Sequence, residues 1–324
     1  MEILVCGGAG YIGSHMVRLL AEQGHVVVTF DNLSTGHAEA VQWGEVVVGD
    51  VLDAAAVDAV LSRRNFDAVL HFAARSLVGE SVSLPYDYYR SNVAGSLMLV
   101  SAMQRHGVEK LIFSSSAAVF GSSAVPIVDE NQPLLPINPY GRSKLMVEQM
   151  LADAAEAYGL RSVCLRYFNA AGASRDARIG ESHACETHLI PNVLRSMLGA
   201  AAPLQVFGDD YATPDGTCIR DYVHVEDLAD AHLRALHFLE QAPGAHAFNL
   251  GNGQGFSVRQ VIDAASRVVG RPVPYQVAPR RSGDPEILVA SSRKAREVLG
   301  WDARWTELDG IIESAWRWHR AQPW

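Results

Sequence analysis

The chain has 324 residues, of which 48% are hydrophobic and 19% are charged, so it is long and apolar enough to fill a sizeable globular core. Lys and Arg number 27 against 36 Asp and Glu, and the resulting net charge of −9 disfavours binding to a nucleic-acid polymer or an anionic membrane. The sequence has no apolar run of membrane-spanning length, its first residues do not resemble a secretory leader, and its four cysteines are irregularly spaced. We therefore expect a cytoplasmic protein with reduced cysteines.

Short β-branched runs alternate with longer stretches that can form helices with one apolar face. The expected strands are 3–6, 26–30, 46–48, 68–71, 111–113 and 162–165, and the expected helices are 11–23, 53–64, 86–106 and 142–158. Continuous apolar strands separated by such helices indicate βαβ units whose sheet is buried on both faces. We predict an α/β fold with a Rossmann-type, doubly wound parallel sheet.

The pattern changes after Asn169, where Gly, Ala, Asp, Pro and His become denser and the elements shorter. We expect a dinucleotide-binding domain over 1–168 and a smaller, mixed α/β substrate-binding domain mainly over 169–324. Residues 221–224 and 247–250 have strand character again, which predicts that 218–251 returns to the main sheet.

A glycine-rich turn lies between the first expected strand and the first expected helix. Gly7, Gly10 and Gly13 allow a tight turn and close backbone approach, and the helix N-terminus offers free N–H groups to a pyrophosphate. The second strand ends in Asp31, whose carboxylate can bind a ribose diol and would repel a 2′-phosphate. No Lys or Arg occurs among the next five residues, Asn32, Leu33, Ser34, Thr35 and Gly36, which favours NAD over NADP. Asp50 either approaches the adenine or caps the helix 53–64.

Tyr140 and Lys144 lie four residues apart at the start of an expected helix, so they share a face. A cation beside a phenol lowers the pKa of the phenol and makes it a general base. A serine triplet, 114–116, follows the fifth strand at the ligand-binding edge of the sheet, where Ser116 can relay a proton between substrate and Tyr140. We predict these three residues to be catalytic.

The glycine loop, the serine triplet and the Tyr140-x-x-x-Lys144 pattern resemble the extended short-chain dehydrogenase/reductase family. Further matching stretches span nearly the whole chain and resemble its UDP-glucose 4-epimerase branch: 31–36, 71–74, 78–81, 139–149, 166–169, 216–228, 249–251 and 279–284. The resemblance implies that hydride leaves C4 of the sugar for a tightly held NAD while Tyr140 takes the O4 proton. Both return to the opposite face of the rotated 4-keto sugar, which interconverts UDP-glucose and UDP-galactose.

The resemblance also implies two sets of binding residues. Beside NAD it places the glycine loop, residues 31–36 and the catalytic residues, and in addition Tyr11, Ile12, Asp50, Val51, Phe72, Ala73, Ala74, Arg75, Ser76, Asn92 and Phe168. Beside the UDP-sugar it places Ser116, Tyr140, Asn169, His188, Leu189, Gln205, Val206, Phe207, Arg220, Arg281, Asp284 and Leu288. Arginines suit a diphosphate, although Arg220 could instead pair with Asp221 and Arg281 could be a surface residue.

Some positions depart from the family pattern. Ala118 and Phe120 stand where members often carry Thr and Tyr, and Leu288 stands where some carry a bulky Tyr, which leaves the acceptance of N-acetylated sugars open. Ala117 and Ala118 occupy the place of the acid that dehydratases and decarboxylases need, which argues against both. An epimerase for UDP-N-acetylhexosamine, UDP-glucuronate or a UDP-pentose and a non-catalytic NAD-binding protein remain alternatives.

Two further features bear on metals and partners. The spacing of His183, Cys185, Glu186 and His188 is not a usual zinc pattern and no second ligand cluster is nearby, so we predict no metal site. The helices 86–106 and 142–158 are expected side by side, and family members form a homodimer through this pair. Its apolar residues would build either that interface or an internal core: Leu97, Val100, Met103, Met146 and Met150.

Overall fold

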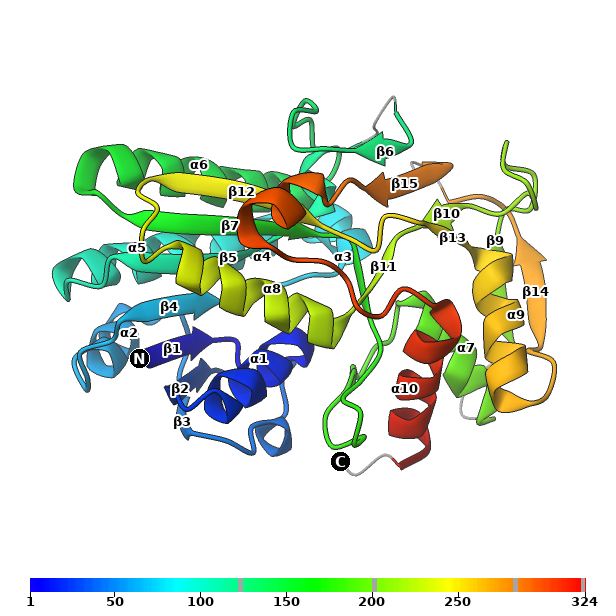
Figure 1. Cartoon of the computed structure of the whole chain (residues 1–324), viewed down its shortest axis with the longest axis horizontal. Coiled ribbons are helices and arrows are strands. Elements are labelled where there is room, and N and C mark those ends of the chain that lie inside the picture. The colour runs from blue at the N-terminus through cyan, green and yellow to red at the C-terminus, as the bar shows by residue number, and fades with distance from the viewer. Residues whose placement is uncertain (122–124, 200–202, 282–284, 322–323) are drawn as a thin grey trace.

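The computed structural model describes residues 1–121, 125–199, 203–281, 285–321 and 324. A seven-stranded parallel sheet in the order β12-β7-β5-β4-β1-β2-β3 forms its centre (Figure 1). The strands are β1 (Glu2–Cys6), β2 (Val26–Asp31), β3 (Glu45–Val48), β4 (Ala68–His71), β5 (Lys110–Ser116), β7 (Arg161–Tyr167) and β12 (Ala245–Leu250). The strand order reverses at β1, where open α/β sheets bind their ligands. The predicted doubly wound parallel sheet is confirmed.

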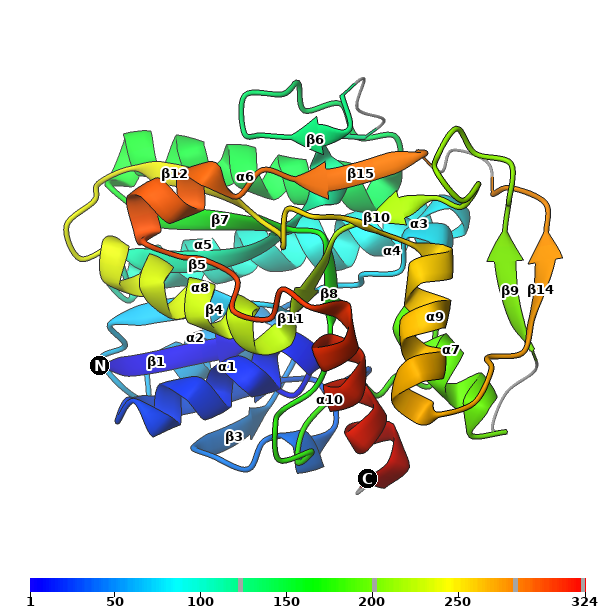
Figure 2. The same ribbon diagram turned by 45° about the vertical axis from the view of Figure 1, so that its right-hand side comes forward.

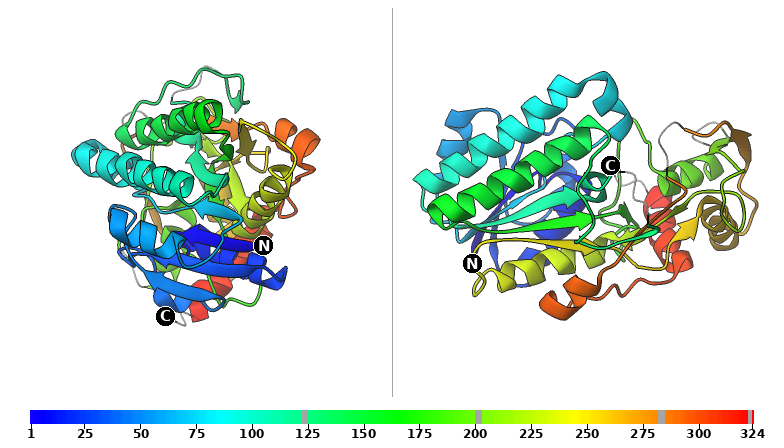
Figure 3. Two further views of the ribbon diagram at one scale, coloured as in Figure 1. Left: turned by 90° about the vertical axis from the view of Figure 1, so that its left-hand side faces the viewer. Right: turned by 90° about the horizontal axis from the view of Figure 1, so that it is seen from above.

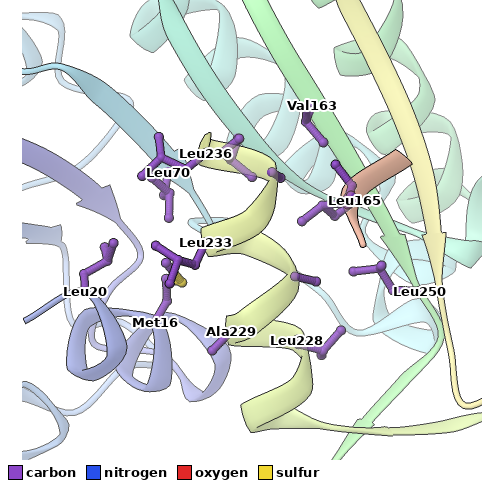
Figure 4. Close-up of a cluster of buried hydrophobic side chains, with 14 of the residues drawn as sticks. Met16, Leu20, Leu70, Val163, Leu165, Leu228, Ala229, Leu233, Leu236 and Leu250 are labelled. Atoms are coloured by element: carbon purple, nitrogen blue, oxygen red, sulfur yellow. The ribbon is translucent and has the colours of Figure 1, made fainter. Parts of the chain in front are cut away.

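Helices cover both faces of this sheet (Figure 3). One face packs against α1 (Tyr11–Glu22) and α8 (Val225–Phe238), and the other against α2 (Ala54–Leu61), α5 (Gly95–Arg105) and α6 (Pro139–Tyr158). Successive side chains of β1 alternate between the two cores, and Figure 4 shows the core under α1 and α8. Burial of both faces explains why the strands are apolar throughout.

Several element boundaries differ from the predictions. Asn138 caps α6 and Pro139 is its first residue, so this helix begins three residues earlier than predicted. The predicted helix 86–106 is confirmed as one continuous helical stretch, but it is not α-helical throughout. It consists of α4 (Pro85–Tyr88), a π-helical turn (Tyr89–Ala94) and α5, and α3 (Val78–Ser83) precedes it.

A second, smaller region lies beyond the carboxyl ends of the strands (Figure 2). It has its own hydrophobic core between α7 (Leu189–Met197), α9 (Val258–Val269) and α10 (Leu308–Ala321). Its strands are short: β6 (Ile127–Val128), β8 (Asn169–Ala171), β9 (Leu204–Phe207), β10 (Ile219–Arg220), β11 (Tyr222–His224), β13 (Phe256–Ser257), β14 (Tyr275–Ala278) and β15 (Ile287–Ala290). They pair as β13-β10-β15-β6, β11-β8 and β14-β9.

The chain rejoins the large sheet at a different point from the one predicted. Residues 222–224 form β11, which pairs with β8 and not with the seven-stranded sheet. The reason is that β8 continues β7 beyond the edge of that sheet and offers β11 a parallel partner there. The return is made by α8, which packs on α1, and by β12, which pairs with β7.

The remaining short elements are the 3-10 turns Ala38–Ala40 and Ala117–Val119 and the π-helical turn Ala295–Leu299. Within the described ranges, no helix combines the length and the apolar character needed to cross a lipid bilayer. Cys6 is fully buried in the sheet and burial raises the pKa of its thiol, as expected for a small core residue.

Candidate active site

Tyr140 lies on the first turn of α6 and faces the end of β5. A Cβ at Gly141 would lie 2.3 Å from the backbone oxygen of Ala118, so only glycine lets α6 begin this close to the turn after β5. This approach brings the Tyr140 hydroxyl near that of Ser116, close enough for Ser116 to favour the phenolate. The phenol is 8% exposed, so it is shielded from water but reachable from the edge of the sheet.

Lys144 lies one turn further along α6. Its Nζ donates to the backbone oxygen of Ser114 over 2.7 Å and lies 5.8 Å from the centre of the Tyr140 ring. Burial lowers the pKa of Lys144 to about 7, although Cys164 and Glu148 act in the opposite direction. Burial also raises the pKa of Tyr140, which the Ser116 hydrogen bond only partly offsets. The predicted lowering of the phenol pKa is therefore wrong for the protein by itself.

A buried ion pair fixes α6 against the sheet. Glu148 accepts from Arg166 of β7, with Nε–Oε1 at 3.0 Å, and also accepts a short hydrogen bond from Ser115 of β5. Both side chains are less than 10% exposed. Glu148 follows Lys144 by one helical turn, so the pair holds the catalytic face of α6 on β5 and β7. Sequence reasoning missed this pair, which joins distant segments.

Asn92 lies in the π-helical turn before α5. Its Oδ1 accepts from the backbone N–H of Arg75 over 2.8 Å, and its Nδ2 donates to the backbone oxygen of Arg75 and to Ser143 Oγ, each over 3.0 Å. Asn92 thus ties the loop after β4 to α6, next to Lys144. Insertions of this kind in helices frequently occur at functional sites.

The expected NAD positions gather along one edge of the sheet, because they follow the carboxyl ends of neighbouring parallel strands. Gly7 has φ +81°, and a Cβ at Gly13 would lie 2.2 Å from the backbone oxygen of Gly7. No side chain caps the N-terminus of α1, which leaves its first N–H groups to a ligand. The turn therefore fits a pyrophosphate.

Asp31 ends β2 and is 8% exposed. Its carboxylate accepts from the backbone N–H groups of Ala9 over 3.0 Å and Leu33 over 2.8 Å. Burial raises the pKa of Asp31, and these two hydrogen bonds act against the rise. The carboxylate thus lies directly beside the glycine loop, which fits a ribose diol.

Asp50 accepts from Asn32 Nδ2 over 2.9 Å and from the backbone N–H of Leu52 over 2.8 Å. The cap of α2 is Asp53, so the capping alternative for Asp50 is wrong. Asp50 instead joins the ends of β2 and β3 at the expected adenine side.

The expected substrate residues come from widely separated segments. Arg220 of β10 is the register partner of Leu288 of β15, and Leu288 packs with Phe120 and Phe168 at the end of the large sheet. Arg220 donates to the backbone oxygens of Ile219 and Pro285 over 2.9 and 2.8 Å. These contacts bring Arg220 and Leu288 to the side of the Ser116 segment.

Asn169 donates through Nδ2 to the backbone oxygen of Asp221 over 2.9 Å. The Asp221 carboxylate itself accepts from three backbone N–H groups, those of Asn252, Gly253 and Ala290. Asn169 is therefore held next to Arg220 by the strand pair β8–β11.

Arg281 stacks over the ring of Phe207, with the guanidinium carbon 3.9 Å from the ring centre. Gln205 is exposed and Val206 is buried in the smaller core, so Val206 offers a ligand only its backbone. Asp284 lies outside the described residues.

His188 precedes α7 and contacts two acidic residues, Glu186 and Glu181, of which the sequence interpretation missed Glu181. Burial raises the pKa of Glu181, but hydrogen bonds from His183 and His188 outweigh it and lower the pKa to about 2. Burial lowers the pKa of His183, but Glu181 and Glu186 outweigh it and raise the pKa to about 10. Alternation of Glu and His over 181–188 is the signal that could have pointed to this group.

Comparison with known proteins identifies the family to which the chain belongs. The model of the NAD dependent epimerase/dehydratase family matches residues 3–251. The chain belongs to this family. The chain is 50% identical to the UDP-glucose 4-epimerase of Halalkalibacterium halodurans, over all of this chain and 97% of that protein.

Solved structures of epimerase/dehydratase family members agree. UDP-glucose 4-epimerase from Brucella ovis in complex with NAD has a TM-score of 0.95 and 50% identity, covering 97% of both chains. The Bifidobacterium longum enzyme in complex with NAD⁺ and UDP has a TM-score of 0.95 and 38% identity, covering 100% of this chain and 99% of that chain. The resemblance found in the sequence is confirmed.

Proposed function

We propose that the chain is an NAD-dependent epimerase that interconverts UDP-glucose and UDP-galactose. The observation that carries the proposal is the position of Tyr140 next to buried Lys144 on the first turns of α6, facing Ser116 at the end of β5 and the same sheet edge as the glycine turn. The full-length identity of 50% to a UDP-glucose 4-epimerase selects this reaction among those of the fold.

NAD would be held by the uncapped first turn of α1 and by Asp31, with Asn92 and Lys144 further along the same edge. When bound, NAD⁺ supplies a hydride acceptor and a positive charge in the oxidised nicotinamide ring. The close approach of a Cβ at Gly36 to Ala9, at 2.8 Å, places residues 31–36 over the glycine turn. This segment has no cationic side chain for a 2′-phosphate, which supports NAD over NADP.

The chain's own residues would move one proton. Tyr140 takes the proton of the sugar O4 hydroxyl and returns it to O4 after the sugar has turned, while Ser116 holds the phenol and O4 in line. Because burial raises the pKa of Tyr140, the phenolate needs a nearby positive charge, which the oxidised nicotinamide ring and a protonated Lys144 would supply. The pocket excludes water because Tyr140, Lys144 and Asn92 are each less than 10% exposed.

Arg220 and Arg281 would bind the diphosphate, because a guanidinium matches the geometry of phosphate oxygens. Phe207 and the strand β9 would hold the uracil, and Asn169, His188 and Leu189 would contact the remainder of the nucleotide. Leu288, beside Phe120 and Phe168, would border the sugar. On this basis residues 1–168 together with α8 and β12 would form mainly the NAD-binding domain, and the other residues after 168 would form mainly the substrate-binding domain.

A homodimer through α5 and α6 is supported by two exposed apolar side chains, Leu97 at 53% and Met146 at 42% exposure. The two helices lie side by side across one face (Figure 3). Met103 is fully buried in the core under α5, so the internal-core alternative holds for this residue. A cytoplasmic location remains our expectation from the free cysteines and the UDP-sugar substrate.

The test is an assay of the purified protein with UDP-galactose and no added NAD. Conversion to UDP-glucose is expected without added NAD, because the bound cofactor returns to the sugar the hydride that it accepted and is not consumed. A panel with the N-acetylated pair, UDP-glucuronate and a UDP-pentose ranks the alternatives. Absence of turnover on either UDP-hexose would overturn the proposal.

A further inference from the structure

Four potential metal ligands meet in the loop before α7. They are the side chains of Glu181, His183, Glu186 and His188, whose ligand atoms all lie within 4.8 Å of one another. No other group of three or more such residues occurs in the described ranges of the chain. The loop thus gathers two imidazole nitrogens and two carboxylates at one point.

Three of the separations, which involve both carboxylate oxygens of Glu186, are close to those of a tetrahedral metal site. His183 Nδ1 lies 3.4 Å from Glu181 Oε1 and 3.3 Å from Glu186 Oε2, and His188 Nδ1 lies 3.5 Å from Glu186 Oε1. Bonds of about 2.0–2.1 Å to a central Zn²⁺ give ligand–ligand separations of about 3.3–3.4 Å. Hydrogen bonds of this type are usually shorter, at about 2.9 Å. His188 Nδ1 and Glu181 Oε1 are closer than a normal hydrogen bond and would have to move apart for both to bind the ion.

The two carboxylates also need positive charge. The side chains of Glu181 and Glu186 are 4% and 3% exposed, and buried carboxylates require a counter-charge. Among the described residues, both form salt bridges only with the two histidines. Arg195 lines the adjoining cavity of about 240 Å³ but makes no salt bridge with them within the described part of the chain.

We propose that this cluster, the Glu181–His188 loop, binds one divalent transition-metal ion, with Zn²⁺ as the best match to two nitrogen and two oxygen ligands. The sequence analysis argued against a metal because the spacing within 183–188 is unusual for zinc and no second ligand cluster is nearby. The folded loop adds Glu181 and brings it together with Glu186 and the two histidines.

The ion would have a structural role. The backbone oxygen of Glu181 accepts from Trp318 Nε1 over 2.9 Å. The backbone oxygen of Ser182 lies 3.1 Å from His37 Nε2. The loop therefore joins α10 to the NAD-binding half and ends at His188 and Leu189, two expected substrate residues. A metal ion would fix this joint and the start of α7.

The experiment uses untagged protein and needs no turnover. Metal analysis of the purified chain is expected to find about one Zn²⁺ per chain. After chelation, Co²⁺ is expected to give the visible absorption of a four-coordinate site, and Zn²⁺ is expected to raise the Tm by a few degrees. His183→Ala and Glu186→Gln are expected to weaken Zn²⁺ binding by at least about 100-fold in competition with a chromogenic chelator.

The matched control is His106→Ala, which removes a histidine that pairs with a surface carboxylate, Asp58, at 3.1 Å. It is expected to leave Zn²⁺ binding unchanged. If chelated wild-type protein binds Zn²⁺ no more tightly than the His183→Ala and Glu186→Gln variants, or shows no four-coordinate Co²⁺ spectrum, the proposal is wrong and the histidines neutralise the carboxylates as imidazolium ions. Wild-type data alone decide the matter if a variant fails to fold.

Discussion

The large sheet and the smaller region place their functional residues in different ways. In the sheet, short contiguous motifs lie at the ends of parallel strands, and Tyr140 and Lys144 share one turn of one helix. In the smaller region, single residues are brought together by pairing of short strands such as β10 and β15. The sheet would thus carry the chemistry and the cofactor, whereas the smaller region would hold the nucleotide. Variants in the two regions should therefore change different kinetic constants.

The largest effect is expected for Tyr140→Phe. Loss of the acid/base hydroxyl should lower kcat about 10³-fold or more with little change in UDP affinity, since the ring still fills its site. Steady-state assays and UDP titrations measure the two quantities. Tyr158→Phe, at the exposed end of the same helix, is the control and should keep full activity. Full turnover by the Tyr140→Phe variant would contradict the assignment of the catalytic chemistry to the sheet region.

Gly13→Ala tests the cofactor half of the comparison. The new Cβ would lie 2.2 Å from the backbone oxygen of Gly7, so the turn must open and NAD binding should be lost. The readout is the amount of NAD(H) released per chain on denaturation. Gly79→Ala, where a Cβ meets no atom within 4 Å, should release the wild-type amount. Release of NADP(H) by the wild type would contradict the role given to Asp31.

Arg281→Ala tests the nucleotide half. Loss of a charged hydrogen-bond donor to the diphosphate should raise KM about 10- to 100-fold and change kcat less. The neighbouring Arg280→Ala removes a surface ion pair with Asp210 at 2.7 Å and should leave KM near its wild-type value. Equal effects of both substitutions would mean that Arg281 is an ordinary surface arginine.

Asp227 tests how the two regions are joined. Its carboxylate on α8 accepts from the backbone N–H groups of Arg304 and Trp305, each over 3.0 Å, and burial raises its pKa to about 6 although these bonds oppose the rise. The folded state then binds more protons than the unfolded state between pH about 4 and 6. Asp227 therefore makes its full contribution to the free energy of unfolding below about pH 4. This contribution falls by at most about 3 kcal/mol as the pH rises through about 6.

Unfolding of wild-type and Asp227→Asn protein across this range should show that difference. The wild type should lose stability relative to the variant as pH rises from 4 to 6. Asp153→Asn, at an exposed position of α6, should give parallel curves. A constant difference between wild type and Asp227→Asn would rule out the titration of this joint.

The smallest effect on turnover is expected at the α5–α6 face. Leu97→Asp combined with Met146→Asp should convert a dimer into a monomer in light-scattering measurements, because charges would have to be buried at the interface. Leu135→Asp, at a 68% exposed position outside these helices, should remain dimeric. A wild-type protein that is monomeric would contradict the homodimer.

The contrast also explains what could be predicted from the sequence. Apolar strands, the glycine turn and the Tyr140–Lys144 spacing are local patterns, so the sheet and its motifs followed from them. The Arg220–Leu288 register and the Glu148–Arg166 ion pair depend on long-range packing. The interruption of the helix at Asn92 and the burial of Met103 likewise depend on neighbouring elements, which local periodicity does not contain.

The Tyr140 pKa shows the same limit within a single motif. Spacing placed Lys144 on the face of the phenol, but burial decides the direction of the pKa shift of Tyr140, and Ser116 only partly opposes it. Both influences on the pKa of Tyr140 arise only in the folded protein, so the spacing of two residues cannot predict them.

The most direct measurement follows deuterium at C4 of the sugar. The purified protein is given UDP-galactose deuterated at C4 in ordinary water without added NAD, and the UDP-glucose is examined by NMR. If the hydride that leaves C4 is held by the cofactor bound at the sheet edge and then returns to C4, the product keeps its deuterium at C4. A product that carries hydrogen from water at C4 would contradict the account.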